Sequence, residues 1–163
     1  MKIKTKSVTN ERQRAHLEDQ SRSLPARLRP LEEKLLSLGG SFALVRHNEP
    51  DAEKILARGE RLSGRGAVLK VVEHNRCHTN AARLWLAAPA RFEIMTGYAL
   101  SSDGLWRQHS WVRQRKDGKL IETTERRVLY FGFALEDGHE SSRFVDANMD
   151  RGEIREILKR KGS

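Results

Sequence analysis

The run Cys77-His-Thr-Asn-Ala-Ala-Arg-Leu-Trp-Leu-Ala-Ala88 decides how the rest of the chain is interpreted. It is rich in helix-forming residues, it follows the polar turn Glu73–Arg76, and Pro89 ends it, so it predicts a helix. The chain's only cysteine stands at the start of this helix, and the small residue Ala81 follows one turn later. We therefore expect a central helix that carries Cys77 in its first turn and packs closely on a sheet.

Four strand-like segments follow the central helix. They are Phe92–Leu100, Leu105–Arg115, Lys119–Thr124 and Arg127–Leu135. Short polar breaks separate them, and the Asp-Gly pair at residues 117–118 between two extended runs is a strong hairpin signal. Consecutive strands joined by short turns predict a small antiparallel sheet.

Shorter elements complete the chain. We expect helices over Asn10–Gln20, with Asn10 as its cap, Leu31–Leu38 and Asp51–Arg58, and strands over Ser41–Arg46 and Ala67–Val72. A basic helix, Arg151–Lys161, closes the chain with Asp150 as its N-cap. The fold class that follows is α+β, with a helical N-terminal part, a central helix on a small antiparallel sheet, and a C-terminal helix.

The length of 163 residues suits one domain of ordinary size. We expect a basic arm over residues 1–30, a single domain over 31–150 with its core at 67–135, and a basic helix over 151–163. No apolar stretch reaches the roughly 18 residues of a membrane span, and no apolar run follows the basic start as in a secretory signal. One cysteine excludes an internal disulfide, so a cytoplasmic protein without a membrane partner is the simplest interpretation.

The net charge of +9 is concentrated at the two ends of the chain. Residues 1–30 hold eight Lys/Arg against three Asp/Glu, and residues 151–163 hold five against two, whereas residues 31–150 are nearly neutral. A domain that reads nucleic acid is expected to carry its charge on the folded face. The pattern favours solvated ends that contact an acidic partner over ends that recognise nucleic acid.

A cysteine in the first turn of a helix is a candidate nucleophile. The unpaired N–H groups and the positive end of the helix dipole stabilise a thiolate and lower the thiol pKa. The same N–H groups are suited to hold a developing oxyanion, and the side chain of Asn75 is a candidate second donor. The alternative is a buried cysteine that acts as a small hydrophobic residue.

A thiolate nucleophile needs a base, and the base needs an orienting group. His109 lies in the middle of one expected strand and Glu122 lies on the next. A hairpin centred near residues 116–118 puts the partner of His109 at about residue 125, so a bulge or a shifted turn is needed to bring Glu122 to it. Trp111 lies on the same strand face as His109 and would either shield the His–Glu pair from water or simply fill the core.

Four short segments, in chain order, resemble the transglutaminase-like and papain-like cysteine enzymes. Cys77-x-x-x-Ala followed by Arg-Leu resembles the nucleophile helix, and Phe92-Glu-Ile-Met-Thr-Gly-Tyr98 resembles the strand before the histidine. His109-Ser-Trp-Val resembles the histidine strand, and Gly118-Lys-Leu-Ile-Glu-Thr-Thr124 resembles the final strand. Glu122 stands where the family usually has Asp.

This resemblance, which covers about residues 67–135, implies a compact helix-on-sheet core and cysteine-dependent acyl transfer without a metal or other cofactor. It implies Cys77 as nucleophile, His109 as base and then acid, and Glu122 as the group that fixes the imidazole tautomer. The implied substrate is a protein or peptide-like amide that passes through a thioester and is then hydrolysed, deamidated or transferred.

Two other interpretations stay open. His74, Cys77, His78 and His109 are residues of the types that bind zinc, although His78 is expected to point to a different side of the helix from Cys77. A module that binds nucleic acid or protein would instead use the basic ends and the arginine- and aromatic-rich segment Arg126–Phe133. Rapid labelling of Cys77 by a thiol reagent at neutral pH distinguishes the enzyme from the binding module.

Overall fold

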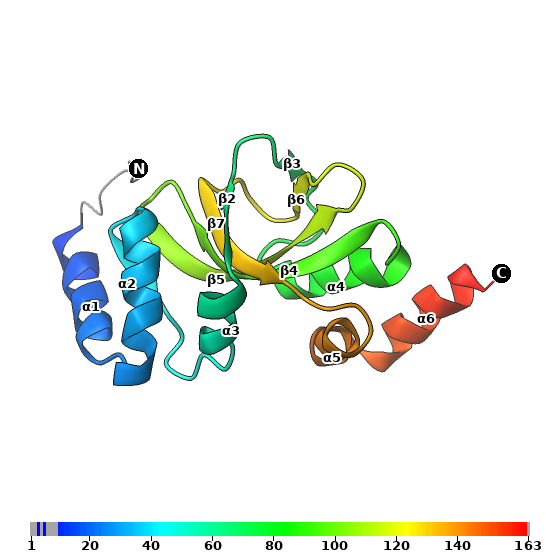
Figure 1. Cartoon of the computed structure of the whole chain (residues 1–163), viewed down its shortest axis with the longest axis horizontal. Coiled ribbons are helices and arrows are strands. Elements are labelled where there is room, and N and C mark those ends of the chain that lie inside the picture. Colours follow the sequence, from blue (N-terminus) through cyan, green and yellow to red (C-terminus); the bar gives the residue numbers. More distant parts are fainter. Residues whose placement is uncertain (1–2, 4, 6–9, 163) are drawn as a thin grey trace. The chain divides into compact units, whose positions relative to one another are not determined.

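The structure is a computed structural model that describes residue 3, residue 5 and residues 10–162 (Figure 1). Its contacts divide the chain into two compact units. Unit 1 comprises Met1–Gly64, Gly97–Gln108 and Arg127–Phe133, and unit 2 comprises Arg65–Thr96, His109–Arg126 and Ala134–Ser163. The strands β4 (Phe92–Leu100), β5 (Leu105–Gln114) and β7 (Leu129–Ala134) each have residues in both units.

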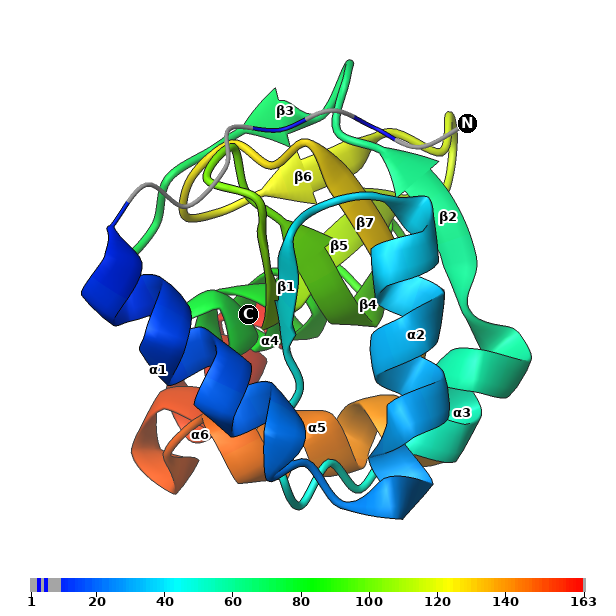
Figure 2. The same cartoon turned by 90° about the vertical axis from the view of Figure 1, so that its left-hand side faces the viewer.

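Unit 1 combines helices with one end of these strands (Figure 2). Its own elements are α1 (Glu11–Arg22), the 3-10 turn η1 (Ala26–Leu28), α2 (Arg29–Leu38), β1 (Phe42–Leu44), α3 (Ala52–Arg58) and β2 (Glu60–Ser63). Its strands are hydrogen-bonded in the order β2-β7-β4-β5, and β1 pairs in parallel with β5. Both α1 and α2 pack on β1, which runs between them in Figure 2.

Leucines from the helices make much of the core of unit 1. Leu28, Leu31 and Leu35 are fully buried, and Leu17 of α1 is 5% exposed. α1 begins where the sequence predicts, because the Asn10 side chain accepts a first-turn backbone N–H at 3.1 Å. Within the segment expected to be a solvated basic arm, α1 packs on β1, because most of its polar residues face solvent while Leu17 faces the core.

A buried polar pair links strand β4 to the loop between β1 and α3. The Tyr98 hydroxyl donates to Glu49 Oε1 at 2.7 Å and accepts the Arg46 N–H at 3.2 Å. Glu49 Oε2 accepts the Asp51 N–H at 3.3 Å. Burial, followed by the charge of Glu49, raises the pKa of Tyr98 far above its ordinary value. The phenol therefore keeps its proton and serves as a fixed hydrogen-bond donor.

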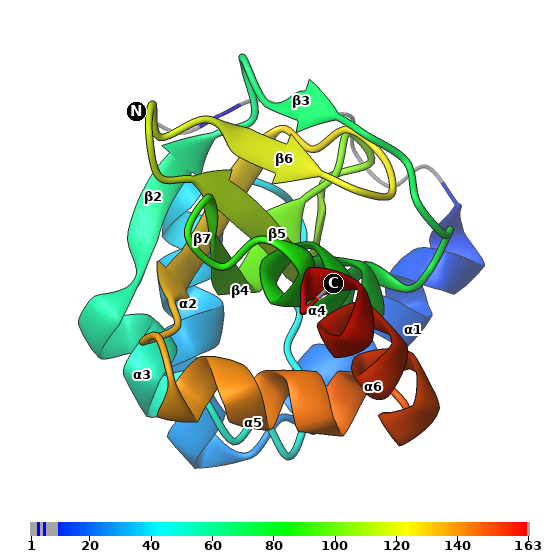
Figure 3. The same cartoon turned by 90° about the vertical axis from the view of Figure 1, so that its right-hand side faces the viewer.

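Unit 2 combines helices with strand segments of its own (Figure 3). Its own elements are β3 (Val68–Leu69), α4 (Cys77–Ala87), β6 (Leu120–Glu122), α5 (His139–Asn148) and α6 (Arg151–Lys161). Its strands follow the order β4-β5-β6-β3, in which β5 and β6 are antiparallel and β3 and β6 are parallel. α4 packs against both α5 and α6, so the helix that begins at the cysteine is held by the C-terminal part of the chain.

Most of the expected elements are confirmed. α4 begins at Cys77, β4 has the expected bounds, and α6 is capped by Asp150, whose side chain accepts the Glu153 N–H at 2.8 Å. The α+β class holds for the described residues, but the expectation of an antiparallel sheet is wrong, since β1–β5 and β3–β6 are parallel pairs. The helix α5 was not expected, because its polar sequence folds around one buried face that includes Val145.

Within residues 3, 5 and 10–162, no helix combines the length and the apolar composition that crossing a bilayer requires.

Candidate active site

Cys77 is the first residue of α4 and is partly exposed. The chain turns into the helix through Asn75, whose φ of 60° is left-handed, a conformation that asparagine tolerates better than most residues. Two hydrogen bonds from α4 hold this loop in place. Arg83 Nη1 donates to Glu73 Oε1 at 2.9 Å, and Asn80 Nδ2 donates to the Glu73 carbonyl at 2.8 Å. The sulfur therefore lies next to a loop that hydrogen bonds hold in place, at the positive N-terminal end of α4.

His109 projects from β5 and is 2% exposed. Its Nε2 donates to Glu122 Oε1 at 2.8 Å, and Glu122 is 1% exposed. The Trp111 ring is nearly parallel to the imidazole, with the ring centroids 6.0 Å apart and 20° between the planes. The predicted contact of His109 with both Glu122 and Trp111 is therefore present in the structure.

The register of β5 and β6 explains how Glu122 reaches the histidine. Val112 pairs with Ile121, and continuing this antiparallel register puts Glu122 opposite Trp111 and diagonal to His109. A diagonal neighbour lies about 7–8 Å away across a sheet, within reach of a long side chain. The expected partner at about residue 125 is off by one, because the turn that joins the strands is longer than a two-residue hairpin, with Gln114 N–H bonded to Lys119 O at 2.8 Å.

Thr124 fixes the carboxylate. Its backbone N–H and its hydroxyl both donate to Glu122 Oε2, at 3.0 Å and 2.9 Å. Since the other oxygen, Oε1, accepts from His109, both oxygens of the buried acid have partners. A carboxylate bonded in this way stays ionised more readily than an unpaired buried one, so it is suited to stabilise a protonated imidazole.

The thiol of Cys77 is hydrogen-bonded to His109 and to His78. Burial by itself raises the pKa of Cys77, but the bonds to these two imidazoles, together with electrostatic attraction to the rings, lower it to about 5. Burial by itself lowers the pKa of His109, but its bonds to Cys77 and Glu122 and their charges raise it. These opposite shifts favour a thiolate–imidazolium pair at neutral pH. Because Nε2 of His109 bonds Glu122, the nitrogen left to face sulfur is Nδ1.

His78 is held by a second row of polar groups. Its Nδ1 lies 2.6 Å from Ser110 Oγ, which lies 2.9 Å from Thr96 Oγ1. Ser110 is fully buried and Thr96 is 5% exposed. The ring also meets the edge of Phe144 in α5, with the centroids 6.1 Å apart. The sequence-based expectation that His78 points away from Cys77 is therefore wrong.

Two further candidate residues from the sequence lie in an exposed turn rather than in the buried cluster around Cys77. Asn75 and His74 are exposed in the turn before α4. Within the described ranges, no group of three or more His, Cys, Asp or Glu residues is arranged to hold a metal ion. The zinc interpretation gains no support from this arrangement, and a bond from Asn75 to a substrate stays a prediction.

Ser110 and Thr96 were not expected at the site, and His78 was considered only as a zinc ligand. The sequence feature that could have pointed to two of them is their position beside predicted site residues, since His78 follows Cys77 and Ser110 follows His109. Adjacent residues on a helix or strand usually diverge, so sequence spacing alone gives no reason to bring these neighbours together.

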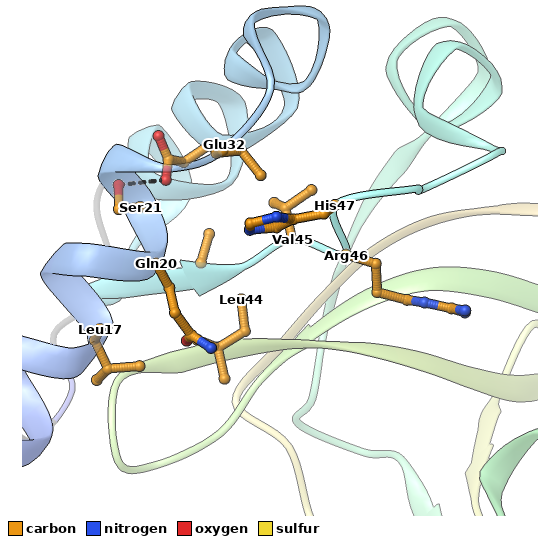
Figure 4. Close-up of a pocket in the computed structure, with 10 residues that line it drawn as sticks. Leu17, Gln20, Ser21, Glu32, Leu44, Val45, Arg46 and His47 are labelled. Atoms are coloured by element: carbon orange, nitrogen blue, oxygen red, sulfur yellow. Dashed lines mark hydrogen bonds between the residues drawn. The ribbon is translucent and has the colours of Figure 1, made fainter.

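Unit 1 has a pocket of its own, of about 260 Å³, between α1, α2 and the end of β1 (Figure 4). Leucine and valine side chains line it beside Gln20 and His47. Its buried acid Glu32 accepts bonds from Ser21 Oγ at 2.7 Å and Arg29 NH1 at 3.0 Å. Since the acid already has partners and no thiol lies there, the candidate active site is the cluster in unit 2.

Comparisons with protein-family models, with curated proteins and with solved structures each found no match for this chain. The chemistry of the cluster is therefore what indicates an activity. A nucleophile, a base and an orienting acid that are hydrogen-bonded in series can attack a carbonyl and pass a proton to the leaving group.

Proposed function

We propose that this protein is a cysteine-dependent acyl-transfer enzyme with a Cys77–His109–Glu122 triad. The observation that carries the proposal is the hydrogen-bonded series from the partly exposed thiol, through the buried imidazole, to Glu122 Oε1 at 2.8 Å. Residues 67–135 would form the transglutaminase-like or papain-like core that their resemblance implies. We also propose a cytoplasmic location, because a lone reactive thiol is best preserved in a reducing compartment.

In the proposed reaction, Sγ of Cys77 attacks the carbonyl carbon of a protein or peptide-like amide. The imidazolium of His109 then gives its Nδ1 proton to the leaving nitrogen as the C–N bond breaks, which leaves a thioester on sulfur. His109, now neutral, takes a proton from water or an amine as that acceptor attacks the thioester. Glu122 holds the ring orientation throughout and stabilises its charged form.

Trp111 would have a supporting role in this site. The indole is fully buried and stacks on the imidazole of His109. An apolar ring in this position excludes water from one face of the His109–Glu122 bond and strengthens it, because hydrogen bonds gain strength in a low-dielectric environment.

A trapping experiment tests the proposed function. The parent protein and Cys77→Ser are incubated with peptides that offer backbone amides and glutamine side chains, with hydroxylamine present to intercept thioesters as hydroxamates. We expect hydroxamate products from the parent and none from Cys77→Ser, with a large loss in His109→Ala. Equal yields from the parent and Cys77→Ser, for esters as well as amides, would show that Cys77 does not transfer acyl groups.

A further inference from the structure

His78 is a second imidazole on the sulfur that the triad does not use. Its Nδ1 is occupied by Ser110 Oγ at 2.6 Å, so the nitrogen that faces Cys77 is Nε2. A thiolate can only accept hydrogen bonds, and the bond from His78 contributes to the low pKa of Cys77. With Nδ1 held by Ser110, the proton that this bond requires belongs on Nε2.

This N–H can reach the oxyanion when the sulfur is acylated. In the tetrahedral intermediate the oxyanion is on the carbon joined to Sγ, so a donor that lies beside Sγ lies beside the oxygen as well. Once sulfur has formed its bond to carbon it loses its negative charge and becomes a poor acceptor. The proton that held the thiolate is then available to the oxygen, which has become the strongest acceptor nearby.

We propose that the Nε2–H of His78, with the backbone N–H of Cys77, forms the oxyanion hole of this enzyme. Ser110 and Thr96 are positioning residues, because their hydroxyls hold Nδ1 in a buried row and leave Nε2 directed at the reacting centre. The inference rests on the proposed acyl transfer at Cys77, and it assigns to His78 the role that the sequence suggested for Asn75.

The backbone partner follows from the position of Cys77 in α4. The first N–H groups of an α-helix have no acceptor within the helix, and Cys77 is the first residue of α4, one turn before the Asn80 N–H that bonds Arg76 O at 2.9 Å. A donor pair made of one backbone N–H and one side-chain N–H can surround a single oxygen from two directions. Removing one such donor typically costs about 100-fold to 1,000-fold in rate.

Two reagents separate this role from stabilisation of the thiolate. p-Nitrophenyl acetate acylates sulfur through a tetrahedral oxyanion: the S–C bond forms, the carbonyl π electrons move to oxygen, and they return as p-nitrophenolate leaves. Iodoacetamide alkylates the same sulfur by displacing iodide, without an oxyanion. For each variant, both rate constants are measured across pH and divided by the thiolate fraction, and the ratio of acylation to alkylation is compared.

We expect His78→Ala to lower this ratio by about 100-fold, while the thiolate-normalised alkylation rate changes by less than about threefold. His78→Gln keeps an N–H donor and is expected to recover most of the ratio. Ser110→Ala is expected to lower the ratio several-fold, and Ser110→Thr, which keeps a hydroxyl, to restore it. His139→Ala is the matched control, because it removes an exposed histidine from the first position of another helix in unit 2.

A ratio that is unchanged in His78→Ala overturns the inference, and so does a fall in both normalised rates by the same factor. A loss of ratio in Asn75→Ala but not in His78→Ala would assign the donor to Asn75. Failure of the proposed function is recognised separately. In that case intact-mass analysis of the parent protein finds no acetyl group on Cys77, or Cys77→Ser releases p-nitrophenolate as fast as the parent.

Discussion

Each unit has a buried carboxylate that is hydrogen-bonded to a ring side chain of a strand. The two pairs differ in the group that bonds the other side of the ring side chain. In unit 1, Glu49 accepts from Tyr98 at 2.7 Å, and the phenol oxygen in turn accepts a backbone N–H from Arg46. In unit 2, Glu122 accepts from His109 at 2.8 Å, and the far side of that ring is bonded to the thiol of Cys77. The same buried motif ends in the backbone in one unit and at a thiol in the other.

The difference shows what makes a buried polar pair reactive. The tyrosine has a pKa raised far from neutrality, so it keeps its proton and serves as a fixed bond. The histidine has its pKa raised, while the thiol beside it has a pKa lowered to about 5. Of the two pairs, the one in unit 2 therefore has pKa shifts that favour a thiolate beside an imidazolium, at a partly exposed sulfur.

Removal of His109 is expected to give the largest effect. His109→Ala takes away one of the two imidazoles on sulfur, so the pKa of Cys77 rises from about 5 toward its ordinary value. At pH 6 the thiolate fraction then falls, and alkylation by iodoacetamide slows on the order of 100-fold. The measurement is the pH profile of labelling. Profiles that coincide for the variant and the parent would remove His109 from the site.

Removal of α1 tests whether unit 1 is held by packing. A protein without residues 1–20 loses Leu17, which is 5% exposed, and a buried leucine typically contributes about 2–5 kcal/mol. We expect a clearly lower Tm and urea midpoint. Leu17→Ala serves as the smaller matched change, and Glu18→Ala, at an exposed position of the same helix, as its control. An unchanged Tm would restore the description of this segment as a solvated arm.

Glu122→Gln tests whether the negative charge of Glu122 stabilises the protonated His109 in unit 2. The amide oxygen can still accept from His109, but the negative charge that stabilises the imidazolium is lost. We expect the pKa of His109 to fall and that of Cys77 to rise, so that labelling near pH 6 slows about tenfold. A zinc site would behave differently, since a chelator would speed labelling and Glu122→Gln would leave it unaltered. Overlapping profiles for the parent and Glu122→Gln would remove Glu122 from the site, and labelling that a chelator leaves unchanged would exclude the zinc site.

The smallest expected effect is on unit 1, and it is on stability alone. Tyr98→Phe leaves Glu49 Oε1 and the Arg46 N–H without their phenol partner, which typically costs about 1–3 kcal/mol. Urea unfolding measures the loss. The pH profile of Cys77 labelling is expected to match that of the parent, and a shifted profile would contradict the view that this pair is only structural.

The local elements of this protein follow from the residues of each segment alone. Helix-forming residues bounded by a polar turn and Pro89 set α4 at Cys77, and a strand-like run before the polar break at residues 101–104 set β4. These features depend on residues that are neighbours in the chain, so residue propensities and the start and stop signals of helices are sufficient to predict them. The order of Cys77, His109 and Glu122 along the helix and the two strands could be predicted for the same reason.

The contacts between distant segments could not be predicted in this way, because they form when the chain packs. The parallel pairing of β3 with β6, the burial of Leu17 and the diagonal approach of Glu122 to His109 depend on register and packing. His78 is the clearest case, because helical geometry alone directs adjacent residues apart. It reaches the sulfur because Ser110, which is far away in sequence, fixes the other side of its ring at 2.6 Å.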